Sequence, residues 1–296
     1  MDVAGVVVSL PAVALLGVVV GVVAGMFGVG GGFLLTPLLS IIFDIPMPIA
    51  VGTGLCQMIG IAIVALLRHK KLGQGEHRFD WLMFAGSALG AAAGSVAVSA
   101  LERQGSVTFG SGEIPVVTLV LYGAYTVLLA SCSWLFWRQG VQTIEALNDP
   151  QTRPLTRLRF GPLVDFDRAG IVGVSAIGVA YVGLALGFLS GVMGIGGGVA
   201  LMPILIYGYG FPIKQAAGTG ILALLLTVTV GTVSHALAGH VHLGLACVLL
   251  IGSTISAQLG AILTRKLPAR TLRRVFAALL WFAVLAIIWD TLRDVL

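Results

Sequence analysis

Apolar residues form long stretches along this chain, separated by short polar connections. These stretches run over about residues 6–27, 33–43, 49–67, 81–100, 115–137, 170–193, 199–209, 213–237, 241–263 and 275–290. At least six of them are long enough to cross a ~30 Å hydrocarbon core as helices, which takes roughly 17–25 residues. The pattern therefore predicts an all-α polytopic membrane protein.

Two of the stretches, 33–43 and 199–209, are too short to span a membrane, because a helix of that length reaches only about 16 Å. Each follows a glycine triplet and is closed by proline or glycine-rich residues. Glycine costs about 1 kcal/mol relative to alanine inside a helix, so three in succession predict a break. Each short stretch is then the second arm of a re-entrant or strongly tilted hairpin.

The sequence also repeats itself at a constant offset of 166 residues. Residues 25–37 return as residues 191–203, and the same offset maps Thr53 onto Thr219 and His69 onto His235. A register this constant over roughly seventy residues indicates a duplicated unit. We therefore expect a first transmembrane repeat at 1–138, a cytoplasmic linker at 139–169 and a second transmembrane repeat at 170–296.

Composition places this duplicated chain in lipid. Of 296 residues, 58% are hydrophobic and only 10% are charged, and the mean hydropathy is +1.05. An average soluble domain carries about 25% charged residues. The net charge of +5 lies in a few loops and does not form a basic stripe interleaved with aromatic residues, so nucleic-acid binding is not expected.

The distribution of basic residues predicts the topology. Lys and Arg cluster in the connection at 68–80, in the central linker and in the connection at 264–274, whereas the loops at 44–48, 101–114 and 239–242 contain few. The positive-inside rule places the basic loops in the cytoplasm. If each glycine-broken hairpin enters and leaves on one side, each repeat is a hairpin plus three spans. The two repeats are then inverted, and both termini are periplasmic.

The glycine triplets are the first candidate for a binding site. A break at membrane depth leaves backbone groups that lipid cannot satisfy, and a protein-lined cavity tolerates it best. The arm after each break begins a helix, whose free N–H groups and partial positive charge favour an anion. The alternative is that the glycines only permit close helix packing. The predicted substrate-binding glycines are Gly30, Gly31, Gly32, Gly196, Gly197 and Gly198.

Matching Gly-Thr-Gly triplets at 52–54 and 218–220 add hydroxyl donors to this prediction. Thr53 and Thr219 are expected to donate to a bound oxyanion, with Gly54 and Gly220 letting it approach the backbone. The alternative is that each hydroxyl bonds back to its own helix. Gln57 lies one turn beyond Thr53. Its counterpart in the second repeat is Ala223, so any role for Gln57 is confined to the first repeat.

Two matching histidines, His69 and His235, end corresponding spans. A histidine near pH 7 can tune a gate or pass a proton. The alternative is that both are ordinary interfacial residues at helix ends.

Several kinds of chemistry have no support in the sequence. No Asp, Glu, Lys or Arg lies deep in a predicted span, and Asp80 falls at a span end. There is no nucleotide-binding fingerprint and no His, Cys and carboxylate cluster with metal-ligand spacing. We therefore expect no cofactor and no metal. The three cysteines are expected to be small buried hydrophobic residues.

In its glycine-broken hairpins and Gly-Thr-Gly triplets, the chain resembles the TauE/SafE family of sulfite exporters. The resemblance rests on residues 25–37, 51–54 and 86–94, and again on 191–203, 217–220 and 252–260, and it covers nearly the whole chain. It implies a secondary transporter of the bacterial inner membrane that carries sulfite, thiosulfate, a sulfonate such as sulfoacetate or another small anion. It also implies that the two glycine triplets, Thr53 and Thr219 line the site.

The sequence thus predicts a transporter, not an enzyme, that exports a small inorganic or organosulfur anion by alternating access. An anion-selective channel built from paired re-entrant hairpins is the main alternative. An intramembrane enzyme using Ser190 and His235 lacks any acyl-transfer signature around the serine, and an assembly role is the remaining alternative. The sequence leaves open whether the protein is a homo-oligomer.

Overall fold

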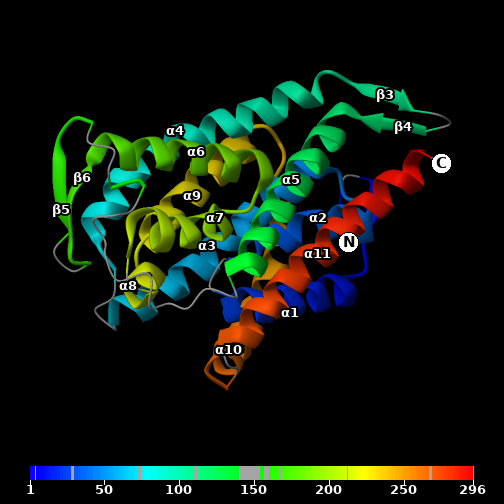
Figure 1. Cartoon of the computed structure of the whole chain (residues 1–296). Coiled ribbons are helices and arrows are strands. Elements are labelled where there is room, and N and C mark those ends of the chain that lie inside the picture. Colours follow the sequence, from blue (N-terminus) through cyan, green and yellow to red (C-terminus); the bar gives the residue numbers. More distant parts are fainter. Residues whose placement is uncertain are drawn as a thin grey trace.

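The computed structural model describes residues 1–296 except 4, 28–29, 72–74, 110–111, 140–153, 157–159, 167–168, 212, 267–268 and 296. Helices dominate the fold (Figure 1). They are α1 Leu10–Phe27, α2 Gly32–Phe43, α3 Met47–Lys71, α4 His77–Glu102, α5 Val116–Gln139, α6 Ala176–Met193, α7 Gly198–Pro203, the π-helix η3 Ile204–Tyr209, α8 Ile213–Gly218, α9 Ile221–Leu237, α10 Leu243–Lys266 and α11 Ala269–Val295.

Six of these helices are long and apolar enough to cross a membrane. The qualifying segments are Met47–Leu67, His77–Glu102, Val116–Trp134, Ala176–Met193, Leu243–Gly260 and Arg274–Arg293. Shorter apolar helices cover Leu10–Met26, Gly32–Phe43, Gly198–Tyr209 and Ile221–Leu237. The chain is therefore a multi-pass, mainly α-helical membrane protein, as the hydrophobic pattern predicts.

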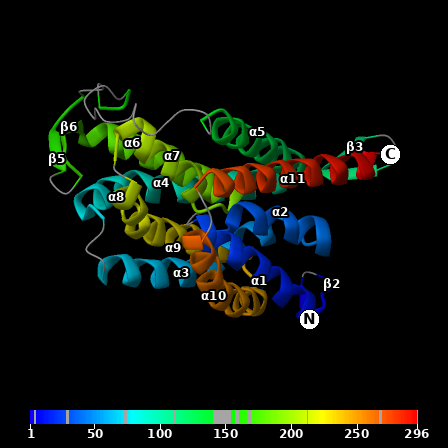
Figure 2. The same cartoon turned by 60° about the horizontal axis from the view of Figure 1, so that its bottom comes forward.

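Three small antiparallel hairpins add to the helices, which the sequence analysis did not expect. They are β1–β2 (Asp2–Val3 and Val6–Val7), β3–β4 (Ser106–Phe109 and Gly112–Pro115) and β5–β6 (Leu163–Phe166 and Ile171–Ser175). Both termini and β3–β4 lie at one end of the molecule, and β5–β6 and α8 lie at the other (Figures 1 and 2). Because β6 takes up residues 171–175, α6 begins only at Ala176, after the predicted start at 170.

Glycine stripes hold two pairs of long helices together. On α4 the stripe is Gly86, Gly90 and Gly94, which face the carbonyl oxygens of Ala180, Leu184 and Phe188 of α6 in that order. On α1 the stripe is Gly17, Gly21 and Gly25, which face the backbone of Leu249, Ser253 and Ala257 of α10 in that order. In each pair the residue numbers of successive contacts rise on both helices, so the two helices run parallel. Glycine is needed because a side chain would overlap the partner's backbone.

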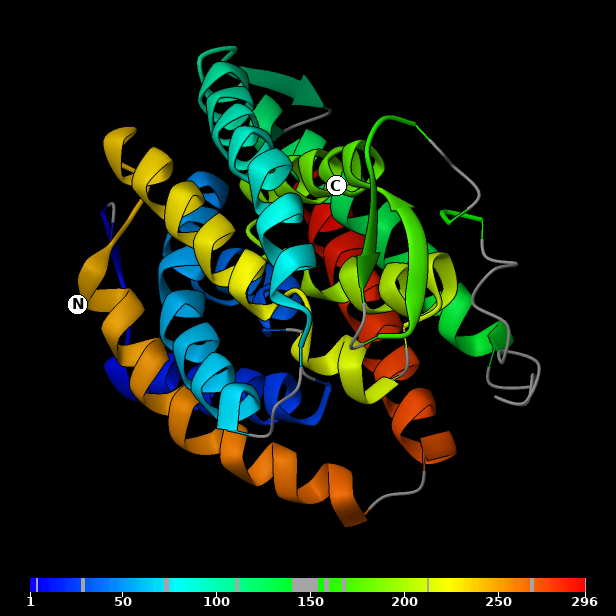
Figure 3. The ribbon, with the colours of Figure 1, turned by 90° about the vertical axis from the view of Figure 1, so that its left-hand side faces the viewer.

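The packing is reciprocal between the halves of the chain. The offset of 166 residues maps α1 onto α6 and α4 onto α10, so the pairs α1–α10 and α6–α4 correspond. Helices α3 and α9, which correspond to each other, also pack together, as do α5 and α11 (Figures 2 and 3). The duplicated unit is therefore assembled by contacts between the copies.

An aromatic cluster joins the central connection to the helices at the β5–β6 end. Phe79 is fully buried, and its ring centroid lies 5.4 Å from that of Phe166, 5.3 Å from that of Tyr209 and 5.2 Å from that of Phe211. All three contacts are edge-to-face. Phe166 lies within the predicted linker at 139–169, so this part of the linker packs into the fold. The division at 138 and 169 stays a prediction.

Candidate functional site

The two glycine breaks form matching hairpin tips. In the first half, Gly30 and Gly31 have φ of 80° and 75°, and the Gly31 carbonyl accepts the N–H groups of Leu34 and Leu35 as α2 begins. In the second half, Gly196 and Gly197 have φ of 65° and 73°, and the segment Gly198–Tyr209 begins in the same way. Left-handed backbone of this kind favours glycine, so these residues specify the breaks.

The two tips touch each other. A Cβ added to Gly32 would lie 2.5 Å from the carbonyl oxygen of Gly194 and 3.2 Å from the Cα of Ile195. The methyl group of Met58, which is fully buried, lies against both Gly30 and Gly196. The fold thus brings Gly30, Gly32 and Gly196 to the contact between the tips, whereas Gly31 faces Val20 and Ala24 of α1 and Gly197 faces Leu186 of α6. It also places Met58, whose position on α3 had no distinguishing signal, between Gly30 and Gly196.

Thr36 supplies a hydroxyl at this junction that the sequence analysis missed. It is fully buried on α2. Its Oγ1 would lie 3.2 Å from a Cβ on Gly54 and 3.1 Å from a Cβ on Gly194, so it faces the Gly-Thr-Gly triplet and the opposite tip. The neighbouring Tyr125 hydroxyl is in reach of Thr36 but donates to the carbonyl of Met193.

Buried polar atoms without a hydrogen-bond partner gather on the elements that form this region. Within the described part of the chain they are Thr36 Oγ1 on α2, Gln57 Oε1 on α3 and Ser190 Oγ on α6, and also Asp80 Oδ2 at the start of α4, which lies 3.6 Å from Nδ1 of His77. An unpaired buried polar group costs about 1–3 kcal/mol, so such groups point to a ligand or a functional state. The signal for Thr36 was a polar residue inside a short apolar arm, but Met202 stands at its repeat position.

The hydroxyl oxygens of Thr53 and Thr219 each accept a backbone N–H group from the other half of the chain. Thr53 Oγ1 accepts the backbone N–H of His242 at 3.1 Å, and Thr219 Oγ1 accepts that of Glu76 at 3.1 Å. Glu76 and His242 are themselves related by the offset of 166 residues. Each triplet therefore fastens the start of a long helix in the other half.

The second triplet differs from the first in its backbone. Residues 52–54 lie within the continuous helix α3, whereas Thr219 and Gly220 separate α8 from α9, and Gly220 has a φ of 88°. The Gly220 N–H donates to Oδ1 of Asp80 at 2.5 Å. Asp80 stands in the first turn of α4, as the sequence predicts for a span end, but its side chain is only 1% exposed.

Gln57 is buried and makes one of its two kinds of hydrogen bond. Its Nε2 donates to Ser253 Oγ at 2.6 Å, which ties α3 to α10. A similar contact joins α4 to α9, where Ser87 Oγ and Thr227 Oγ1 lie 2.5 Å apart. Ser87 and Thr227 line a small pocket beside the second tip, together with Met83, Leu186, Gly187, Gly196, Gly197, Leu201 and Leu224.

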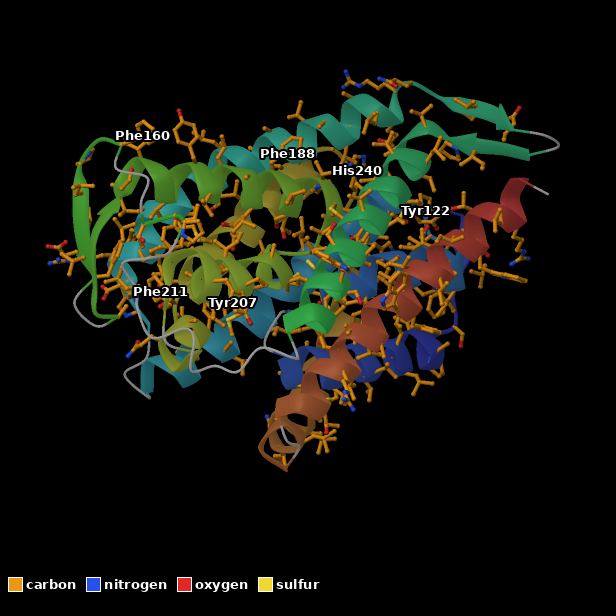
Figure 4. All side chains as sticks on the ribbon, in the orientation of Figure 1. Tyr122, Phe160, Phe188, Tyr207, Phe211 and His240 are labelled. Carbon is orange, nitrogen blue, oxygen red and sulfur yellow. The ribbon has the colours of Figure 1, made fainter. Side chains whose placement is uncertain are left out.

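His235 lies inside the protein and takes part in a chain of contacts. One ring nitrogen, Nε2, lies 2.7 Å from the Gly191 carbonyl oxygen, and Nδ1 lies 3.3 Å from Nδ1 of His240. Nε2 of His240 lies 2.8 Å from Oε2 of Glu102. Figure 4 shows His240 towards the end of the molecule that carries β3–β4. His69 belongs to α3, but its side chain lies outside the described ones.

Few charged side chains are buried in the part of the molecule that the structure describes. Among the described side chains no Lys or Arg is buried, and the buried charged residues are Glu76 and Asp80. In the same part of the chain there is no group of three or more His, Cys, Asp or Glu residues placed to hold a metal ion.

Comparison with known proteins agrees with this architecture. The family model described as sulfite exporter TauE/SafE matches residues 13–287. A probable membrane transporter protein of Bacillus subtilis, YunE, is 26% identical over 87% of this chain and 89% of its own length. A probable membrane transporter protein of Methanocaldococcus jannaschii is 27% identical over 92% of both chains, and one of Haemophilus influenzae is 26% identical over 90% of this chain and 93% of its own.

No solved structure matches the chain. The family match extends from the first helix to the last and includes both hairpin tips. Relatives from different organisms that match over almost their whole length are named membrane transporters, which is a transport function and not an enzymatic one. The chain therefore belongs to the sulfite exporter TauE/SafE family of membrane transporters.

Proposed function

We propose that this protein is a secondary transporter that exports a small anion across the bacterial inner membrane by alternating access. Sulfite or an organosulfonate such as sulfoacetate is the proposed cargo, in keeping with the family name. The observation that carries the proposal is the meeting of two glycine-broken tips around Met58, beside the buried Thr36 hydroxyl, which makes no hydrogen bond of ordinary geometry in the described part of the chain.

Two inverted repeats account for the packing. Helix α1 begins, and α4 ends, at the end of the molecule that holds the termini, so these two helices run in opposite directions (Figure 1). Because α6 runs parallel to α4, it is opposed to its own counterpart α1. The loop at 101–114 at that end has few basic residues, so we place this end and both termini in the periplasm.

Anion binding requires the tips to separate. Even a methyl group on Gly32 would overlap the Gly194 carbonyl, so the described conformation holds the tips against each other. Separation of the tips would expose the first N–H groups of α2 and of the segment Gly198–Tyr209, together with the Thr36 hydroxyl. These groups stabilise a negative charge without a cationic side chain. We propose that the predicted triplets line this space, with Thr53, Gly54, Gln57, Thr219 and Gly220 behind them.

Export of an anion needs no further energy source in a cell that is negative inside. Each negative charge that leaves gains about 2.3 kcal/mol per 100 mV. The tight contact between the tips favours a carrier over an open channel, because a continuous pore needs space between them. Efflux that saturates with sulfite concentration would support the carrier, and ohmic single-channel currents would support the channel.

The test of the site is Gly32→Ala, with Gly123→Ala as the matched control. A Cβ on Gly32 meets the opposite tip, whereas a Cβ on Gly123 of α5 meets nothing within 4 Å. Proteoliposomes loaded with sulfite should show efflux reduced at least about tenfold for Gly32→Ala and unchanged for Gly123→Ala. Alternating access must return through the closed contact between the tips, and about 1.4 kcal/mol of strain in that contact suffices to slow the cycle tenfold. Wild-type efflux from a Gly32→Ala protein that elutes as a folded species would overturn the assignment of the tips.

A further inference from the structure

The buried pair His235 and His240 has a hydrogen-bond arrangement that fixes its proton count. The contacts run from the Gly191 carbonyl through His235 and His240 to the Glu102 carboxylate. With Glu102 ionised, both ends of this hydrogen-bonded series are acceptors, because a carbonyl and a carboxylate have no proton to donate. Each of the three contacts needs one N–H, so the two imidazoles together must carry three protons. Two neutral imidazoles carry two.

The hydrogen-bonded series from Gly191 to Glu102 therefore holds one proton more than two neutral histidines and an ionised glutamate supply. His235 donates through Nε2, His240 donates through Nδ1 to His235, and His240 donates through Nε2 to Glu102. The side chain of His240 is 6% exposed, and that of Glu102 is 49% exposed. The proton is thus buried next to a carboxylate that reaches solvent, which gives it an entry path from the end that carries β3–β4.

The charged groups brought to the pair by the described elements are Glu102 and, next to it, the exposed Arg103. Helix α6 contributes the Gly191 carbonyl, and α3 contributes Gly52, whose added Cβ would lie 3.0 Å from the Cβ of His235. Helix α4 contributes Glu102, followed by the exposed Arg103. His242 uses its Nδ1 to accept the Leu245 N–H at the start of α10.

The inner end of this hydrogen-bonded series, the Gly191 carbonyl, lies next to the second hairpin tip. Helix α6 ends at Met193, and the N–H of Gly194 closes its last turn on the Ser190 carbonyl. The break leaves the carbonyls of the last turn without their helical donors. His235 supplies the donor for Gly191. If the extra proton leaves, two protons remain for three contacts, so one contact pairs two acceptors and must open.

We propose that the chain Gly191–His235–His240–Glu102 is a proton-binding site that couples anion transport to the proton gradient. In each cycle one proton enters at Glu102, resides on the imidazole pair, and leaves from His235 to water when the second tip opens to the opposite side. One proton then moves inward for each anion that moves outward. This inference rests on the proposed transport function and adds its coupling ion.

Glu102→Gln tests the proposal with little change in shape. The amide N–H₂ of glutamine can donate to Nε2 of His240, so all three contacts are kept with both imidazoles neutral. The variant should fold and bind anion but need no extra proton. His242→Asn is the matched control. Asparagine keeps the capping acceptor at the start of α10, and position 242 is not part of the hydrogen-bonded series.

The transport measurement uses proteoliposomes with the membrane voltage clamped at zero and sulfoacetate as the probe. The carboxylate of sulfoacetate stays ionised between about pH 6 and pH 8, so the probe does not itself carry the gradient. With one proton per anion, a difference of one pH unit should shift the equilibrium sulfoacetate ratio about tenfold in the wild type and in His242→Asn. Glu102→Gln should show no shift. An equal shift in Glu102→Gln would overturn the proposal.

A direct proton count separates this inference from the proposed function. Nitrogen-15 spectra of histidine-labelled protein in nanodiscs should show one imidazolium at about pH 7.5 in the wild type and none from this pair in Glu102→Gln, with His240→Gln assigning the signal. Two neutral imidazoles in the wild type would refute the inference even if the protein transports anions. Sulfoacetate flux that is absent from the wild type at any voltage would instead refute the transport function for this probe.

Discussion

Replacement of Thr36 by valine gives the sharpest test of the anion site, because it should make the protein more stable and less able to bind its substrate. The Thr36 hydroxyl is fully buried and makes no hydrogen bond of ordinary geometry in the described part of the chain, although the Tyr125 hydroxyl, which donates to the Met193 carbonyl, lies within reach. Valine has nearly the same shape and puts a methyl group where the hydroxyl stands. The substitution therefore removes one polar group and leaves the packing of α2 against the opposite tip unchanged.

The two expected effects have opposite signs and can be estimated separately. A buried hydroxyl that lacks a partner costs about 1–3 kcal/mol, so its removal should raise the free energy of unfolding by roughly 1 kcal/mol or more. A hydrogen bond to a charged group contributes about 1.5–3 kcal/mol. Its loss should therefore weaken anion binding by about 10- to 150-fold.

The assay combines calorimetric sulfite binding to purified protein with SDS-induced unfolding in micelles. Thr232→Val is the control, because the Thr232 hydroxyl on α9 already donates to the Val228 carbonyl at 2.7 Å. That control should bind sulfite as the wild type does. If Thr36→Val binds sulfite with wild-type affinity, the hydroxyl is not a ligand. If it instead lowers the stability, the hydroxyl has a structural partner and the argument from its isolation fails.

Two further substitutions test the contacts that hold the repeats together. Gly90→Ala should lower the free energy of unfolding by about 1–3 kcal/mol, since a Cβ there would overlap the backbone of α6, whereas Gly123→Ala should be neutral or slightly stabilising; equal stabilities in SDS-induced unfolding would contradict the close packing of α4 on α6. Asp80→Ala should be less stable than Asp80→Asn by about 1–3 kcal/mol in the same measurement, because asparagine still accepts the Gly220 N–H and alanine leaves that buried group unpaired. Equal loss in both Asp80 variants would show that the bond to Gly220 contributes nothing.

The helices could be predicted closely because their signals are local. The short arms expected at 33–43 and 199–209 occur at Gly32–Phe43 and Gly198–Tyr209, after glycines whose positive φ ends the preceding helix. The prediction was incomplete where tertiary contacts decide between backbone conformations that the local sequence favours equally. The two Gly-Thr-Gly triplets have the same letters, but only the second interrupts its helix, where Asp80 from α4 takes the Gly220 N–H.

The candidate site could be predicted only in part. The repeat pointed to both glycine triplets, and Gly30, Gly32 and Gly196 lie where the two tips touch. It could not point to Thr36 or Met58, because the offset maps Thr36 onto Met202 and no repeat signal distinguishes Met58. It also singled out His235 but not its link to Glu102, since these residues lie 133 positions apart in the sequence and meet only through His240.

The sequence by itself determined that this chain lies in lipid, that it consists of two related units and that each unit contains a glycine-broken arm. These properties follow from hydrophobicity, from the constant offset and from the backbone freedom of glycine, all of which are present before folding. Only the tertiary structure decided which buried polar atoms find partners. Hydrogen bonding in the interior depends on distances of about 3 Å between residues far apart in the chain, and packing of the two units against each other sets those distances.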